Sequence, residues 1–243
     1  MEQIIEHLKY LRLNFIAENL QKLLGQAEQE KLDRIDFLQM LIQTEREEKK
    51  QRAVKRRIKA AKIPVHKTLE QFNFAHPKFI EAEKIRLLFR MDFIAAKKNI
   101  IFCGGVGLGK THLASALAVH SCQSGYNVLF TPAVDIINQL SEAQKKGNFT
   151  QTLRKYIKVQ LLVIDELGYM PIDKAGCDML FQVISGRYEK AATIITTNRA
   201  YKQWPVIFNN DAVVTSAILD RVLHHSETIR IEGNSYRMSD RQI

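Results

Sequence analysis

A glycine-rich segment in the middle of the chain has the spacing of a phosphate-binding loop. Residues 104–111 read GGVGLGKT, the pattern G-x-x-x-x-G-K-T, between the apolar run 99–103 and a helix-like stretch, HLASALAVHSC. Glycines let the backbone curve around phosphates with its N–H groups turned inward, and the helix N-terminus adds partial positive charge. Lys110 is expected to reach the β- and γ-phosphates of ATP, and the Thr111 hydroxyl to ligate Mg²⁺. The residues predicted to bind the nucleotide are Gly104, Gly105, Val106, Gly107, Leu108, Gly109, Lys110, Thr111 and His112.

Two carboxylates end a second apolar run, LLVIDE, at Asp165 and Glu166. A carboxylate at the carboxyl end of a buried parallel strand lies at the edge of the sheet where ligands bind. We predict that Asp165 binds Mg²⁺ and that Glu166 orients and deprotonates the attacking water. Such a string alone more often marks a strand leaving the core. Together with the phosphate loop upstream, it favours nucleotide hydrolysis.

A third polar strand end lies in the segment TIITTNR, where Thr197 and Asn198 follow the expected strand 193–196. Its amide is in a position to hydrogen-bond the attacking water or the γ-phosphate. The alternative is an ordinary turn, for which asparagine is a common choice. The two upstream motifs favour the catalytic interpretation of Asn198.

These motifs need a sheet to hold them, and the second part of the chain alternates strand and helix patterns. Apolar runs without polar alternation, joined by helices, predict an α/β fold with a parallel sheet buried on both faces. Helices should fill the gaps between the first four strands, and 211–224 should be helical before the last. A helix is also expected over 79–97. The five expected strands are 99–103, 128–131, 161–165, 193–196 and 228–231.

The first part of the chain reads as an all-helical domain. Apolar residues from Ile4 to Leu24 recur at helical spacing, and Gly25 is expected to end that helix. A second helix should begin near Asp33 and end before Pro64. The predicted organisation is therefore a helical domain at 1–66, an irregular connector at 67–78 and a P-loop ATPase domain at 79–243.

The second helix carries a strongly basic segment, in a chain whose formal net charge is +10. We predict that this segment grips the phosphate backbone of DNA without reading bases, because no aromatic residue is interleaved for stacking. A solvated helix or a membrane-surface helix is the alternative, but the segment lacks the Trp, Phe and Leu of interfacial helices. The predicted DNA-binding residues are Lys49, Lys50, Arg52, Lys55, Arg56, Arg57, Lys59 and Lys62.

The sequence contains no pattern typical of a signal peptide, a membrane span or a zinc site. The N-terminus does not have the apolar core of a signal peptide, and no run approaches the roughly 18 apolar residues of a membrane span. The three cysteines are spaced unlike a zinc site and read as buried thiols. We therefore expect a cytoplasmic protein without a membrane partner.

Several strings together resemble one family. They are GGVGLGKTHLA, LLVIDELGYMPID, LFQVISGRYE, TIITTN, AILDRVLHHS and TIRIEGNSYR. The chain resembles IstB, the transposition helper ATPases of insertion sequences, which belong to the AAA+ superfamily and are similar to the helicase loader DnaC. The resemblance covers nearly the whole chain. It implies ATP binding, assembly into homo-oligomers (rings or helices) on double-stranded DNA, and delivery of that DNA to the transposase of the same insertion sequence.

The resemblance also assigns residues. By position, Asn198 matches the sensor-1 residue, and Arg221 matches the arginine that reaches a neighbouring subunit's nucleotide. Only 22 residues follow Arg221, too few for the helical lid of most AAA+ proteins, so Arg237 is a weak candidate for the sensor-2 arginine. Two other functions stay open: a helicase loader of the DnaC kind, and a metabolic P-loop kinase. The kinase is disfavoured because no second substrate pocket is apparent.

Overall fold

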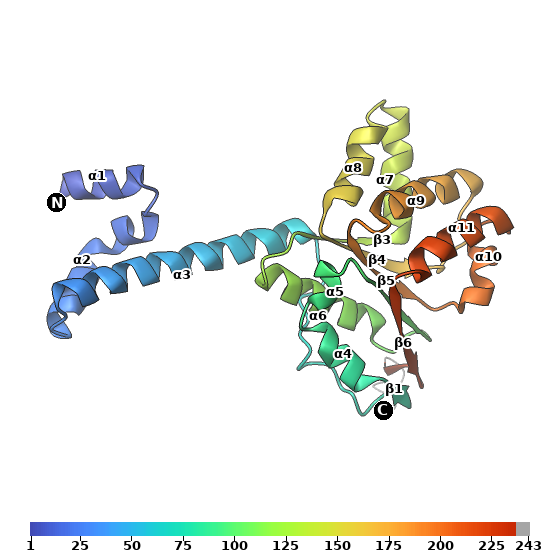
Figure 1. Cartoon of the computed structure of the whole chain (residues 1–243), viewed down its shortest axis with the longest axis horizontal. Helices are drawn as coiled ribbons and strands as arrows, with labels where there is room; N and C mark the ends of the chain where they lie inside the picture. Colours follow the sequence, from blue (N-terminus) through green and yellow to red (C-terminus); the bar gives the residue numbers. More distant parts are fainter. Residues whose placement is uncertain (237–243) are drawn as a thin grey trace, which may run out of the picture. The chain divides into compact units, whose positions relative to one another are not determined.

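The computed structural model describes residues 1–236 and divides the chain into two compact units, Met1–Arg56 and Arg57–Ile243. Figure 1 shows the elements of each unit along the chain. The division falls inside a long helix and earlier than the domain boundary predicted at residue 66.

The N-terminal unit is helical. It contains α1 (Glu2–Tyr10), α2 (Asn14–Gln29) and most of α3 (Arg34–Ala61). The expectation that Gly25 ends the first helix is wrong, because α2 runs through it. The break comes earlier, at Arg12, whose φ of 58° is left-handed. The small core consists of Ile16, Leu20 and Leu23, packed against Ile5, Leu8, Leu13, Leu24, Met40 and Leu41.

A buried carboxylate joins α2 to α3 within this unit. Glu45 is only 3% exposed, and its Oε2 accepts a hydrogen bond of 2.9 Å from the backbone N–H of Ile16. Ile16 lies in the first turn of α2, where N–H groups have no partner inside the helix. Glu45 therefore caps α2 and places a negative charge at the positive end of its dipole.

The second unit, Arg57–Ile243, contains the predicted ATPase domain and is called the ATPase unit below. It is built on one six-stranded sheet, with strand order β1-β6-β2-β5-β4-β3. All pairs are parallel except β1 with β6. The five predicted parallel strands are confirmed, and the sheet gains one antiparallel edge strand that was not predicted. The strands are β1 (Phe79–Ile80), β2 (Asn99–Gly104), β3 (Val128–Pro132), β4 (Leu161–Leu167), β5 (Ala192–Thr197) and β6 (Ser226–Glu232).

The prediction of one helix over 79–97 is wrong. Phe79 and Ile80 instead pair with Glu232 and Ile231 of β6. Two short helices follow, α4 (Ala82–Leu88) and α5 (Asp92–Ala95). They are separated at Met91, whose φ of 64° cannot continue an α-helix.

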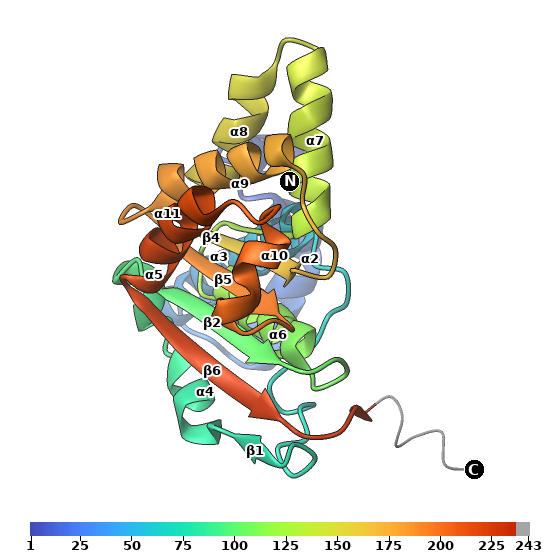
Figure 2. The same cartoon turned by 90° about the vertical axis from the view of Figure 1, so that its right-hand side faces the viewer.

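Helices cover both faces of the sheet, because alternate residues of each strand point to opposite sides. In β2, Ile100 and Phe102 pack with α4, α5 and α6, whereas Ile101 packs with α7 to α11. Figures 1 and 2 show these two layers on either side of the strands. The remaining helices are α6 (Lys110–Gln123), α7 (Ala133–Lys145), α8 (Phe149–Lys158), α9 (Lys174–Arg187), η1 (Tyr201–Gln203), α10 (Trp204–Ile207) and α11 (Ala212–Leu223).

Two findings concern kinds of helix that the sequence does not predict. No helical lid follows β6 within residues 1–236. None of the helices in that part of the chain is both long and apolar enough to cross a bilayer. The sheet of the ATPase unit lies between two layers of helices, as the sequence predicts.

Candidate active site

The phosphate loop leaves β2 and enters α6, as its sequence requires. Gly107 and Gly109 have φ of 76° and 84°, a region that side chains rarely adopt. A Cβ on Gly109 would lie 2.5 Å from the ring of Phe72, so this glycine is also needed for space. The 14-residue helix α6 begins at Lys110 and aims its N-terminus at the loop. This cradle fits a phosphate chain.

Lysine, threonine and aspartate side chains meet at this loop. Lys110 Nζ donates a hydrogen bond of 2.7 Å to the Gly105 carbonyl, which holds its charge within the loop. Thr111 Oγ1 lies 3.0 and 3.2 Å from the two carboxylate oxygens of Asp165, at the end of β4. A hydroxyl beside a carboxylate is the oxygen pair that Mg²⁺ prefers, so these residues fit the ion.

The hydroxyl of Thr196 links both predicted carboxylates. Thr196 Oγ1 donates to Asp165 Oδ1 at 2.5 Å and accepts from the Glu166 backbone N–H at 2.9 Å. Glu166 itself has a φ of 60°, a strained conformation for a glutamate. Its backbone is therefore held by the neighbouring strand β5 while its side chain stays exposed. This arrangement suits a group that must present a carboxylate to a ligand.

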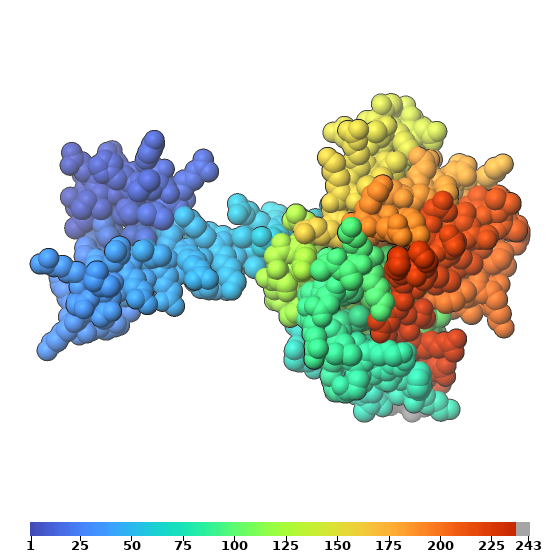
Figure 3. Space-filling model, in the orientation of Figure 1, coloured from blue at the N-terminus to red at the C-terminus, as the bar shows by residue number. Residues whose placement is uncertain are grey.

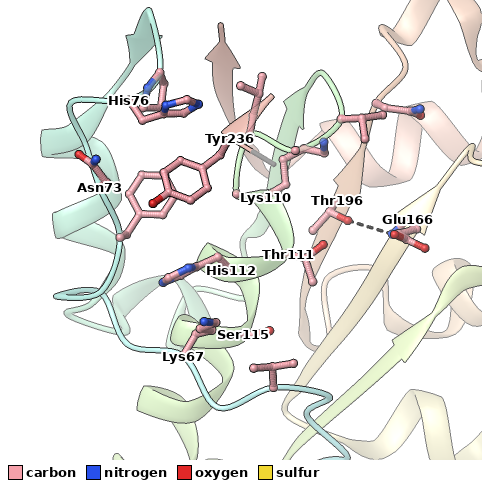
Figure 4. Close-up of a pocket in the computed structure, with 18 of the residues that line it drawn as sticks. Lys67, Asn73, His76, Lys110, Thr111, His112, Ser115, Glu166, Thr196 and Tyr236 are labelled. Carbon is pink, nitrogen blue, oxygen red and sulfur yellow. Dashed lines mark hydrogen bonds between the residues drawn. The ribbon is translucent and has the colours of Figure 1, made fainter. Parts of the chain in front are cut away.

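A pocket of about 510 Å³ brings these elements together. Figure 4 shows Lys110, Thr111, Thr196 and Glu166 gathered at one end of it. The other end is lined by Asn73, His76, His112 and Tyr236, among others. Of the predicted nucleotide-binding residues, Val106 through His112 line the pocket, whereas Gly104 and Gly105 do not.

The segment from Pro64 to Pro77 was not predicted to line the site. It is irregular, as expected, but Phe72, Asn73 and His76 form one wall of the pocket. His112 fastens it to α6, since its Nε2 lies 2.9 Å from the Thr68 carbonyl. Burial lowers the pKa of His112. A segment without periodicity offers no local signal that it packs against a distant loop.

The end of β6 closes the same side of the pocket. The Tyr236 N–H donates 3.0 Å to the Gly107 carbonyl, and the His76 ring contacts the Tyr236 ring edge-on. Ser235 packs so tightly on Gly107 that a Cβ there would lie 2.1 Å from its hydroxyl. The C-terminal segment is therefore part of the phosphate loop's environment. Arg237, the weak sensor-2 candidate, lies outside the described residues.

The two remaining predicted catalytic residues lie in different places. Asn198 follows β5 directly and lines the pocket. Arg221 does not line it. Its Nη1 donates 2.9 Å to the Ala217 carbonyl, and its guanidinium lies 5.0 Å from the centre of the Phe181 ring. Within its own chain, Arg221 is thus on the surface of α11 and away from the phosphate loop.

The predicted DNA-binding residues lie on α3, except Lys62, which comes directly after it. All are exposed apart from Arg57, which is half-buried. Lys49 pairs with Glu45 at 3.7 Å and Arg52 with Glu18 at 3.8 Å. The Arg52–Glu18 pair is exposed on both sides and holds its charges weakly, whereas Lys49 is half-exposed beside a buried carboxylate.

Comparisons with known proteins decide the family. A model of IstB-like ATP-binding proteins matches residues 6–243. The chain belongs to this family. It is 36% identical to the ATP-binding protein of insertion sequence IS5376 from Geobacillus stearothermophilus, over 100% of this chain and 96% of the relative. It is also 36% identical to that of IS21 from Pseudomonas aeruginosa, over 100% and 91%. The resemblance to IstB and the prediction of a P-loop ATPase are thereby confirmed.

Solved structures share the fold of this IstB-like protein. The DnaC helicase loader matches with a TM-score of 0.54 and 24% identity, over 68% of this chain and 96% of its own. DnaA from Aquifex aeolicus bound to AMPPCP matches with a TM-score of 0.58 and 23% identity, over 70% and 52%. The predicted AAA+ fold is confirmed.

Proposed function

We propose that this protein is the ATP-dependent helper of an insertion sequence, which assembles on double-stranded DNA, remodels it and delivers it to a partner transposase. Lys110, Thr111 and Glu166 line one pocket, with Asp165 in hydrogen-bond distance of Thr111, and this convergence supports the hydrolysis step. Two relatives at 36% identity, both named as insertion-sequence proteins, favour transposition over helicase loading.

In the proposed reaction, the loop N–H groups and Lys110 hold the β- and γ-phosphates of ATP. Thr111 and Asp165 would hold Mg²⁺, which neutralises charge on those phosphates. Glu166 accepts a proton from the attacking water, and Asn198 orients that water or the γ-phosphate. Phe72 and Tyr236 offer ring surfaces to the nucleotide base, and the Asn73 amide offers it hydrogen bonds.

The proposed DNA binding rests on the positive charge of α3, and the proposed assembly into oligomers rests on Arg221. The basic residues of α3 hold DNA phosphates, which explains a net charge of +10. A half-buried arginine outside its own chain's pocket suits action on a neighbouring subunit, where it would stabilise transition-state charge. Oligomers on DNA bring such neighbours together.

The substitution Glu166→Gln tests this function. It removes the proton acceptor but leaves the phosphate and Mg²⁺ contacts, so ATP should still bind while turnover falls at least about 100-fold. Lys110→Ala should instead abolish binding. With ATP, Glu166→Gln should accumulate as oligomers on duplex DNA, visible by electron microscopy. Undiminished turnover would overturn the role of Glu166, and ATP-bound protein that stays monomeric on duplex DNA would overturn the assembly.

A further inference from the structure

Three side chains able to bind a metal converge on the surface of the ATPase unit, outside the nucleotide pocket. Glu189 follows α9, and His224 and His225 follow α11. Their ligand atoms all lie within 4.8 Å of one another. Figure 3 shows α9 and α11 side by side at the surface, in orange and red.

The spacing of these atoms is close to that of a metal centre. Glu189 Oε1 lies 3.4 Å from His225 Nε2 and 3.8 Å from His224 Nδ1. In a tetrahedral zinc site with bonds of about 2.0 to 2.1 Å, neighbouring ligand atoms lie about 3.3 Å apart. Small side-chain rotations therefore suffice. Each of the three side chains is 52 to 55% exposed, so a cation reaches them directly from solvent.

Asn99 ties the two ligand-bearing loops together. Its side chain donates 3.0 Å to the Val222 carbonyl and accepts 3.1 Å from the Thr193 N–H. Its own N–H donates 2.7 Å to the His225 carbonyl. The backbone on either side of the cluster is thus fixed to β2, which keeps the three ligands near one another.

A buried arginine fixes the turn that carries Glu189. Arg187 is 2% exposed, and its Nη1 donates to the carbonyls of Tyr156 and Val159 at 2.7 and 2.9 Å. Its Nε donates 3.0 Å to Thr193 Oγ1. Burial lowers the pKa of Arg187 to about 9, which leaves it protonated at pH 7. Two residues later, Glu189 adopts a left-handed φ of 58° that presents it to the histidines.

The Tyr188 hydroxyl is hydrogen-bonded to one of the histidine nitrogens in this structure. Its oxygen lies 2.6 Å from His224 Nδ1. A cation binding at Nδ1 displaces that hydroxyl.

We propose that Glu189, His224 and His225 form a binding site for a divalent cation of the zinc class. Two imidazoles and one carboxylate suit zinc, cobalt or nickel, whereas Mg²⁺ and Ca²⁺ take oxygen ligands. Three ligands from one chain leave a fourth position open to water or another group. His224 comes one helical turn after Arg221, so the cation also holds the end of α11 that carries this arginine; that consequence rests on the proposed function.

Zinc titration of the full chain tests the site, by competition with a chromophoric chelator. Excess Mg²⁺ in the buffer occupies Thr111 and Asp165. We expect one zinc ion per chain. Glu189→Gln and His225→Gln should each weaken binding at least about tenfold. His7→Gln removes another exposed histidine, in the N-terminal unit, and should leave the affinity unchanged.

Thermal unfolding separates lost binding from lost folding. Zinc should raise the melting temperature of the wild type and of His7→Gln, but not that of the double variant His224→Gln/His225→Gln. Wild-type affinity in the double variant would overturn the proposal, as would an equal loss in His7→Gln. Neither readout involves ATP, so the site can fail while the proposed function stands.

Discussion

At the scale of single residues, the active site depends on a hydroxyl that the sequence pattern hides. Thr196 bonds both Asp165 and the backbone of Glu166, yet in the string TIITTN it reads as one more β-branched strand residue. The role of the acids was predictable because their apolar run follows a phosphate-loop motif in the same chain; alone, such a string more often marks a strand leaving the core. The partner that orients them comes from another strand, and only the parallel pairing of β4 with β5 brings it there.

Replacing Thr196 with valine keeps the shape of the side chain and removes the hydroxyl. The Glu166 N–H then loses its acceptor, and Asp165 loses one of its two hydroxyl donors, so both carboxylates are oriented less firmly. We expect kcat to fall about 10- to 100-fold, with a higher Mg²⁺ requirement and little change in KM for ATP. Thr196→Ser should restore most of the rate. Equal kcat in wild type and Thr196→Val would show that the link is only structural.

At the scale of elements, the buried strands could be predicted from the sequence, whereas elements that depend on distant contacts could not. The strands β2, β3, β4 and β5 are largely buried on both faces, and their unbroken apolar runs mark them clearly. The strand β6 is only partly buried and alternates polar with apolar residues. The two-residue strand β1 exists only through its pairing with β6, about 150 residues away, which no local pattern reports. Likewise, the predicted helix over 79–97 contains no glycine or proline at its break. Met91 takes the left-handed conformation there although nothing in its type favours it.

The capping of α2 by Glu45 leads to a prediction about the stability of the N-terminal unit. Glu45→Ala leaves the buried N–H of Ile16 without an acceptor, which should cost about 1 to 3 kcal/mol in the N-terminal unit. Hydrogen exchange of the α2 amides measures this loss. Glu47→Ala is the matched control, since Glu47 is exposed and bonds only the side chain of Gln51 among the hydrogen bonds described. Equal protection of α2 in the two variants would contradict the capping role.

At the scale of the whole molecule, the question is whether Arg221 of one subunit acts on the nucleotide bound by a neighbouring subunit. Arg221→Ala keeps an intact phosphate loop, and Lys110→Ala keeps its arginine. A mixture of the two inactive proteins should therefore recover ATPase activity at shared interfaces. The control replaces Lys110→Ala by the double variant Lys110→Ala/Arg221→Ala, which should recover none. Absence of recovery in the first mixture would remove support for action in trans.

The grip on DNA is tested through its dependence on salt. Affinity for duplex DNA should fall with a log–log slope of about −0.9 per phosphate neutralised. Replacing Arg52, Lys55, Arg56 and Arg57 by glutamine should flatten that slope and leave ATP binding intact. The matched control removes the same charge from exposed residues at the end of α7 and on α8, namely Lys145, Lys146, Arg154 and Lys158. If only the control flattened the slope, the grip would belong to the ATPase unit.

The irregular segment at 64–77 has a consequence in terms of thermodynamic linkage. It lines the nucleotide pocket, and only two residues separate its first residue, Pro64, from the end of the basic helix α3 at Ala61. A nucleotide that repositions this segment therefore acts on chain directly attached to the residues that we propose bind DNA. Coupling of this kind is reciprocal: whatever factor ATP applies to the affinity for DNA, DNA must apply to the affinity for ATP. Measuring either equilibrium with and without the other ligand gives the same free energy.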